Sequence, residues 1–295
     1  MPEAYQIPVG DAWAAILCAC LFGLTGLLVD GLILIRLMVR PIRFQRLSDN
    51  MRAVPLNLND AGLVAIPVMI VWGLVHGVAS VAMQKHWLPE SPAPYVQILI
   101  TLFAFHVPGI VVVLALLRKR GITLARGFGL AWRGAPRYAG YGLVLGLAAL
   151  PVLWLTTALY DLLLVLMGVE IGVQPVMQML LNAASYPWWG QVILALLAIV
   201  VVPAIEEILF RGIALPALSK SYGLVVGIIL TSLVFGVMHV HVPSYLPLFL
   251  LSVGLCLAYA YTGSILVPII IHSTFNLVSI TILWLSVLTG HSPAG

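Results

Sequence analysis

The stretch VILALLAIVVVPAIEEILFRGIALPAL, residues 192–218, decides the fold class because it is long and apolar enough to cross a membrane as a helix. Such a helix needs about 20 predominantly apolar residues. Three charged side chains nevertheless interrupt this run, those of Glu206, Glu207 and Arg211. Because an unpaired charge at the bilayer centre costs roughly 2.5 to 3.5 kcal/mol, these side chains need partners or a function.

The composition extends this interpretation to the whole chain. Of the 295 residues, 62% are hydrophobic and only 8% are charged, whereas an average soluble domain has about 25% charged residues. Apolar segments of span length follow one another without a polar block, and we therefore predict an all-α, polytopic membrane bundle with about eight transmembrane helices. The predicted spans lie near residues 12–38, 61–83, 95–117, 138–166, 189–217, 223–242, 245–262 and 264–288.

The basic residues indicate a membrane topology and not a nucleic-acid surface. The net charge is +4, but the arginines and lysines gather in two segments, 36–52 and 118–137, and short cytoplasmic loops are enriched in such residues. If both segments are cytoplasmic, an even number of spans leaves both termini outside. We expect the Arg-rich stretches 39–60 and 118–137 to be either amphipathic helices on the inner leaflet or solvated loops. The expected partners are the lipid bilayer and a peptide substrate, with no nucleic acid.

The first apolar run is too long for the core of a signal peptide, so we expect it to be a retained span. The cysteines, Cys18, Cys20 and Cys256, all lie in apolar runs. The first two would project about 200° apart on a helix, which is a poor geometry for sharing a metal. We interpret all three as packing residues.

Polar residues gather in the last third of the chain. Glu207 and Arg211 are four residues apart and can form an intrahelical ion pair. Glu206 points about 100° away from Glu207 and is left without that partner. This division predicts one structural carboxylate and one carboxylate that needs partners on other helices or water.

Two later spans offer such partners at helical spacing. Phe235 and His239 are four residues apart on one span, and His272 and Asn276 are four apart on another. We therefore predict a common cavity formed by Glu206, His239, His272 and Asn276. Counting helical rise alone places His239 nearer the outer face and His272 nearer the inner face, which would require tilt, a broken helix or different span ends.

Each piece also has a purely structural interpretation. A Glu-Glu pair near a helix end is often solvated, His239 together with His241 can mark the membrane surface, and a His or Asn inside a span often donates to a neighbouring helix. Their joint occurrence favours a functional site. The expected role of Asp30 is structural. His76 and His106 lie within spans two and three and are interpreted as either packing groups or cavity liners, because no spacing pairs them with the cluster.

The cluster suits peptide hydrolysis. A carboxylate in a cavity of low dielectric constant is a candidate general base for water. Histidines can hold that water, shuttle a proton or bind a metal, and an asparagine amide can donate to an oxyanion. The motifs H-E-x-x-H and G-x-S-x-G are absent, as are paired Gly-Asp sequences within spans, which disfavours other intramembrane hydrolases.

At these residues the chain resembles the CPBP family of CAAX prenyl proteases and bacteriocin-processing enzymes, also called the Abi family. The resemblance covers about residues 190–290, and the first 189 residues, with spans one to four, complete a single membrane domain. The matching motifs are Glu206-Glu207-x-x-x-Arg211, Phe235-x-x-x-His239 and His272-x-x-x-Asn276. Members are glutamic intramembrane endopeptidases that were long classified as metalloproteases.

The resemblance implies a role for each motif residue. Glu206 is the base that activates water, His239 and His272 assist the water, and Asn276 helps to stabilise the oxyanion. Supporting roles are implied for Glu207, Arg211 and Phe235.

Three questions stay open at this point. Zinc bound by Glu206, His239 and His272 is an alternative to the expected metal-free site. A non-catalytic membrane scaffold or immunity protein, or a proton-coupled transporter, is an alternative to the protease. We expect a bacterial inner membrane as the location, and the substrate cannot be inferred from the sequence.

Overall fold

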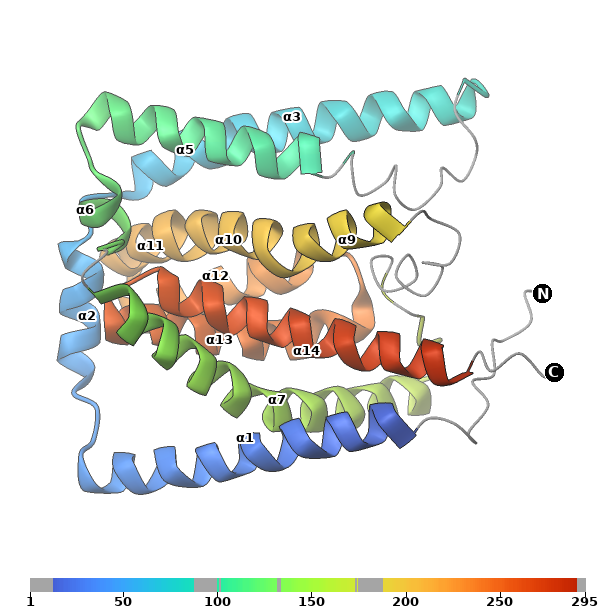
Figure 1. Ribbon diagram of the computed structural model, residues 1–295. Coiled ribbons are helices and arrows are strands. Elements are labelled where there is room, and N and C mark those ends of the chain that lie inside the picture. The colour runs from blue at the N-terminus through green and yellow to red at the C-terminus, as the bar shows by residue number, and fades with distance from the viewer. Residues whose placement is uncertain are drawn as a thin grey trace.

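Long apolar helices make up nearly all of the protein in the computed structural model (Figure 1). The structure describes residues 13–87, 100, 102–131, 134–172, 174 and 188–290. Over these ranges the chain forms helices and connecting turns without any strand, which confirms the predicted all-α class. In this described part of the chain, seven helical segments are long and apolar enough to cross a bilayer. The protein is therefore an integral membrane protein built as a polytopic helical bundle.

The N-terminal part supplies the outer helices of the bundle. In Figure 1, α3 and α5 form one edge and α1 the opposite edge. The elements are α1 (Trp13–Val39), α2 (Phe44–Ala53), α3 (Leu58–Gln84), the π-helical turn η2 (Leu102–His106), α5 (Val107–Arg120), α6 (Leu124–Phe128) and α7 (Ala135–Leu166). The start of the predicted third span, residues 95–99, lies outside the described residues.

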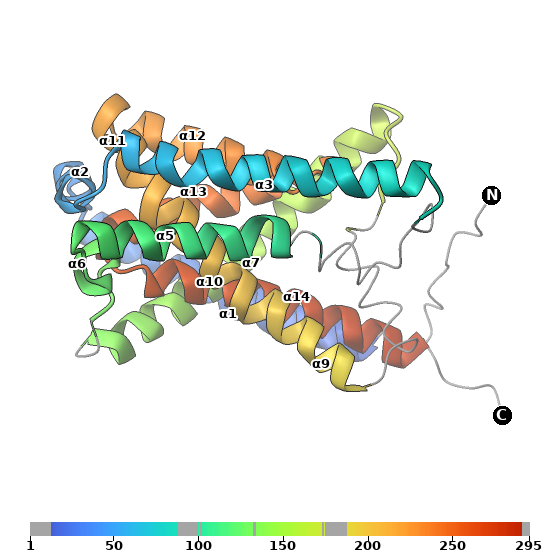
Figure 2. The same ribbon diagram turned by 90° about the horizontal axis from the view of Figure 1, so that it is seen from above.

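The C-terminal part fills the centre of the bundle. A continuous helical run crosses it obliquely (Figure 2) and packs against α14. That run consists of α9 (Trp188–Leu196), the π-helical η5 (Leu197–Val201), α10 (Val202–Glu207), the π-helical η6 (Ile208–Ala214) and α11 (Leu215–Tyr222). It is followed by α12 (Leu224–Val237), the short 3-10 turn η7 (Val242–Ser244), α13 (Tyr245–Thr262) and α14 (Leu266–Gly290).

The predicted sixth span, residues 223–242, is shorter than expected. Its helix α12 has 14 residues, a length of about 21 Å, whereas the hydrocarbon core is about 30 Å thick. The helix ends because the chain turns at Val240, which has a φ of 48°. A β-branched residue rarely adopts this left-handed conformation, so the sequence gives no sign of a turn here.

The basic segments lie at one end of the bundle. Helices α2 and α6 cap that end, and the start of α1 and the end of α14 lie at the other (Figure 1). Helix α2 is one of the expected amphipathic helices, but its buried residues Leu47 and Met51 belong to the protein core. The Asn50 side chain donates to the carbonyl of Ala260 at 2.7 Å. The part of the apolar face of α2 that carries Leu47 and Met51 is therefore covered by protein.

A close backbone contact at Gly129 joins α6 to the start of α14. Gly129 has a φ of 66°, and a Cβ atom there would lie 1.9 Å from the carbonyl oxygen of Gly263. The neighbouring backbone N–H of Ile265 donates to the carbonyl of Phe128 at 2.9 Å. Only glycine fits at position 129 without moving this contact.

We expect Gly129→Ala to destabilise the protein markedly. The matched control is Gly121→Ala, because Gly121 has a φ of 63° but open space around it. The control should cost about 1–2 kcal/mol from the left-handed conformation alone, and Gly129→Ala should cost at least twice as much. Unfolding of both variants in detergent would show this, and equal losses would mean that the backbone contact is unimportant.

Candidate active site

Two wider helical turns flank the glutamates on the long central helix. The turn η5 precedes α10 and η6 follows it, so that Glu206 and Glu207 lie between them. Such π-helical turns are rare and often occur at functional sites. They change the direction in which successive side chains project, which a uniform helical wheel does not predict.

A missing hydrogen bond in η5 explains the position of Asn276. In this turn the N–H of Val202 donates five residues back, to the carbonyl of Leu197. The next N–H in this register would be that of residue 203, which is proline and has none. The carbonyl of Ala198 instead accepts from the Asn276 side-chain nitrogen at 2.8 Å. Asn276 thus attaches α14 to the helix that carries the glutamates, because neighbouring helices satisfy carbonyls freed by proline in a membrane.

The carboxylate of Glu207 lies in a fully buried ion pair. Glu207 and Arg211 both have 0% exposure, and Oε1 of Glu207 lies 2.9 Å from Nη1 of Arg211. The second terminal nitrogen of Arg211, Nη2, donates to Oγ of Ser252 at 2.7 Å. The predicted intrahelical pair is therefore present, and Ser252 of α13 extends it to a neighbouring helix.

The same carboxylate orients His272. Nδ1 of His272 lies 2.9 Å from Oε1 of Glu207. Since a carboxylate accepts, we assign the Nδ1–H tautomer to neutral His272, which leaves its Nε2 lone pair free. Nε2 lies 4.0 Å from Oε2 of Glu206. His272 therefore separates the two glutamates and presents an acceptor towards Glu206.

His239 is oriented in the same way by its own helix. Its Nδ1 lies 2.8 Å from the carbonyl oxygen of Phe235, which can only accept, so Nε2 is again the free nitrogen. The buried ring of Phe235 contacts His239 and His272, with centroid distances of 4.9 and 5.8 Å. The Arg211 guanidinium lies over the Phe235 ring, 4.5 Å from its centroid. Phe235 is the apolar spacer that holds both histidines.

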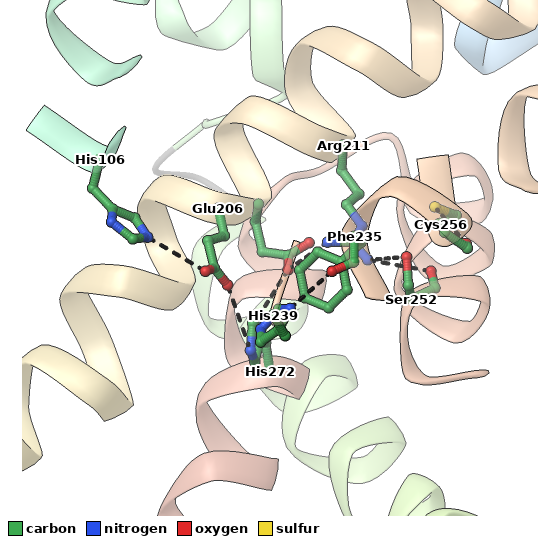
Figure 3. A network of polar contacts seen from close by, with 10 residues as sticks. His106, Glu206, Arg211, Phe235, His239, Ser252, Cys256 and His272 are labelled. Atoms are coloured by element: carbon green, nitrogen blue, oxygen red, sulfur yellow. Dashed lines mark hydrogen bonds and ion pairs between the residues drawn. The ribbon is translucent and has the colours of Figure 1, made fainter. Parts of the chain in front are cut away.

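Glu206 faces three imidazoles and no arginine among the described contacts. Its side chain is 12% exposed, and Oε1 lies 3.4 Å from Nε2 of His106. Nε2 of His272 lies 4.0 Å from Oε2 of Glu206, and His239 is close enough to interact electrostatically with the Glu206 carboxylate. Figure 3 shows Glu206 between His106 on one side and His239 and His272 on the other. One carboxylate thus takes part in the ion pair and the other shares a buried site with histidines.

The histidines approach Glu206 although they lie at different distances along their helices. His239 follows the end of α12, whereas His272 lies about two turns from the start of α14. The helices are therefore not equivalent in depth, and helical rise alone does not predict that His239 and His272 both lie beside Glu206.

The comparison with protein families matches this part of the chain. Residues 187–278 match the family model described as Type II CAAX prenyl endopeptidase Rce1-like. We refer to these residues as the Rce1-like domain because of this similarity. All three motifs lie within the match, which confirms the resemblance to the CPBP family. Comparisons with curated proteins and with solved structures gave no match.

His106 lies outside the Rce1-like domain and was not predicted as a site residue. It belongs to η2, is 6% exposed, and reaches Glu206 from the N-terminal part of the chain. Its other nitrogen, Nδ1, is buried without a hydrogen-bond partner. The only sequence signal was a histidine within an apolar span, which His76 shares; the ring of His76 packs on Trp72 instead, at a centroid distance of 4.7 Å.

A metal-free site at the glutamates stays a prediction. Within the described ranges, no three His, Cys, Asp or Glu side chains are arranged to hold one ion. The Nδ1–H groups of His272 and His239 are engaged by protein acceptors, which leaves the Nε2 atom of each ring free. The zinc site considered from the sequence, with Glu206, His239 and His272 as ligands, would need these side chains to move.

The predicted division of the chain at residue 190 lies close to the start of the Rce1-like match. The division itself stays a prediction. The structure adds that the N-terminal part takes part in the site through His106, so the two parts meet at Glu206.

Proposed function

We propose that this protein is a glutamic intramembrane endopeptidase in which Glu206 activates the attacking water. The Rce1-like domain supports intramembrane endopeptidase activity in general. The observation that carries the finer proposal is the division of labour between adjacent carboxylates. Glu207 is neutralised by Arg211, whereas Glu206 faces only imidazoles. Glu206 is therefore the carboxylate available as a base.

The histidine tautomers favour a water molecule between His239, His272 and Glu206. In their neutral forms both histidines present an unprotonated Nε2, because each Nδ1–H is engaged by a protein acceptor. A water molecule can donate one hydrogen to the Glu206 carboxylate and the other to the Nε2 atom of one histidine, which leaves an oxygen lone pair directed at a carbonyl. This arrangement orients the nucleophile before any proton moves.

The proposed reaction has two proton transfers. Glu206 takes one proton as the water oxygen bonds to the scissile carbonyl carbon, and the carbonyl oxygen becomes an oxyanion. When this intermediate collapses, the C–N bond breaks and Glu206 gives the proton to the leaving amine. The products are a carboxylic acid and an amine, and Glu206 returns to its ionised form.

Asn276 has a narrower role than the sequence suggested. One N–H of its amide is engaged by Ala198, which leaves one N–H for an oxyanion. We keep oxyanion stabilisation as a proposed role of Asn276 and add a structural one, the attachment of α14 to η5. No step is assigned to a metal, and stoichiometric zinc in active protein with loss of activity on chelation would overturn that choice.

The proposed location is a bacterial inner membrane, with both termini outside and the basic end of the bundle in the cytoplasm. Helices α2 and α6 carry the basic segments at one end, and cytoplasmic loops are enriched in such residues. The substrates are membrane proteins or membrane-associated peptides that can place an extended segment at Glu206.

Cleavage in labelled water tests the activity directly. The purified protein is reconstituted in lipid with membrane proteins and peptides of its host, and new termini are identified by mass spectrometry in H₂¹⁸O. Hydrolysis places ¹⁸O in each new carboxyl terminus. Labelled termini that appear only with the protein support a protease, and their absence under folded conditions would favour the scaffold alternative.

A non-catalytic scaffold is favoured by one observation. The side chains of Glu207, Arg211, Ser252 and His272 are buried and contact one another, as the side chains of a structural core would. In that case Glu206 would contribute only packing, and a neutral variant would keep the biological function. A transporter is disfavoured because the polar cluster has no matching half elsewhere in the chain, whereas many carriers contain two related repeats.

We expect His106→Gln to lower kcat by about tenfold or more, because Glu206 would lose an imidazole that orients it. The matched control is His76→Gln, which removes a histidine from another span without touching Glu206. Turnover of a substrate peptide by both variants is the measurement. An unchanged His106→Gln rate would show that His106 only fills space beside the site.

A further inference from the structure

Four arginines converge on one cavity at the basic end of the bundle, away from the glutamates. The cavity has a volume of about 220 Å³ and lies where α1 leads into α2. Its lining consists of Arg36, Arg40, Pro41, Ile42, Arg43, Arg46 and Tyr261. No part of the proposed protease mechanism uses these residues.

Backbone geometry brings the arginines together. Arg36 and Arg40 are four residues apart, and the hydrogen bond from N of Arg40 to O of Arg36, at 2.8 Å, extends the helical turn past α1. Arg43 and Arg46 are joined by a similar bond of 3.0 Å at the start of α2. Because residues three or four apart share a face, each pair presents two guanidinium groups to the same space.

The positive charge in this cavity has no protein counter-charge. Over the residues that the structure covers, none of the four guanidinium groups forms an ion pair with a carboxylate. Asp49, the acidic residue of α2, accepts from Gln45 at 3.0 Å. The guanidinium of Arg46 lies over the ring of Tyr261, 5.6 Å from its centroid. This contact holds the guanidinium at the cavity. Four like charges in one space are stabilised when an anion lies between them.

The same face of α1 continues as an apolar stripe. Leu32, Ile35 and Val39 are 59%, 60% and 73% exposed, and their spacing places them on the face of Arg36. A ligand that combines a phosphate with acyl chains would contact both parts at once. The cavity volume equals that of roughly seven waters at about 30 Å³ each, which accommodates a phosphate and its substituent.

We propose that this arginine cavity binds a phosphate group, carried by an anionic phospholipid whose acyl chains lie along α1. Arginine forks match phosphate oxygens in geometry and charge. Since α2 is fixed to α13 by Asn50, and Lys220 of α11 donates to the carbonyls of Val54 and Leu56 just after α2, the bound lipid stabilises the basic end of the bundle.

Thermal unfolding of the delipidated full-length protein in detergent tests this proposal. Short-chain phosphatidylglycerol is titrated, and the half-saturating concentration for the rise in Tm is measured. Arg40→Gln/Arg43→Gln should raise that concentration by roughly 25-fold, because each basic residue at an anionic surface contributes about a fivefold change in affinity. Arg118→Gln/Lys119→Gln removes the same charge at the same end, outside the cavity, and should leave it within about threefold.

Further ligands identify the source of the phosphate. Phosphatidylcholine should stabilise much less than phosphatidylglycerol, and sodium phosphate should act only at far higher concentration. Sodium phosphate as effective as the lipid would overturn the lipid assignment, and equal losses in the two double variants would overturn the cavity itself. Arg40→Lys/Arg43→Lys keeps the charge, and its partial loss would support recognition by guanidinium forks. Unfolding without ligand verifies that each variant is folded.

Discussion

The Glu206→Gln variant is expected to lose at least 10²- to 10⁴-fold in cleavage rate, the range for removal of a general base, while it keeps its fold. Gln has the shape of Glu and can still contact Nε2 of His106, which lies 3.4 Å from Oε1. It cannot accept the proton of the attacking water. Because the buried pair of Glu207 and Arg211 is untouched, the unfolding temperature should change little. Initial rates on one defined peptide provide the measurement.

The matched control for that substitution is Asp30→Asn, which neutralises a carboxylate in another span. Asp30 lies in α1 and belongs to none of the contacts around Glu206. Its variant should cleave at the rate of the wild type. A Glu206→Gln enzyme that cleaves at the wild-type rate would exclude Glu206 as the base and would indicate a different proteolytic mechanism.

The Arg211→Met variant is expected to lose roughly 3–5 kcal/mol of stability, the cost of leaving one charge of a buried pair unpaired. Glu207 is fully buried, and without the guanidinium its carboxylate keeps only the contact to His272. The hydrogen bond to Ser252 and the contact over Phe235 are lost as well. Unfolding in mixed detergent gives the free energy.

A second substitution separates charge from packing in this prediction. Glu207→Gln removes the buried negative charge but leaves an oxygen that can accept from Nδ1 of His272. The double variant Glu207→Gln/Arg211→Met should therefore be more stable than Arg211→Met alone. If the single and double variants unfold alike, the ion pair has little energetic importance, and the loss comes from packing against Phe235.

Local spacing made most of the fold and the ion pair between Glu207 and Arg211 predictable. Apolar run lengths indicated the membrane helices, and the four-residue spacing of Glu207 and Arg211 indicated their ion pair. These features depend on one helix at a time, so no knowledge of tertiary packing was needed.

The features that were not predicted depend on packing or on unusual backbone geometry. His106 reaches Glu206 from η2, and its spacing along the chain carries no sign of that contact. The left-handed conformation of Val240, which follows the end of α12 at Val237, is rare for its residue type. The two π-helical turns also lack a periodic signature, so a uniform helical wheel does not predict where they lie.

The bond between Asn276 and Ala198 has a consequence for how sequence variation in this protein is read. Pro203 leaves the carbonyl of Ala198 without its backbone donor, and the amide of Asn276 replaces that donor. Pro203 and Asn276 therefore act together across two helices, although only Asn276 belongs to one of the three motifs. A substitution of Asn276 also leaves the carbonyl of Ala198 without a donor, so a loss of activity in such a variant is not by itself a measure of the part that Asn276 takes in catalysis.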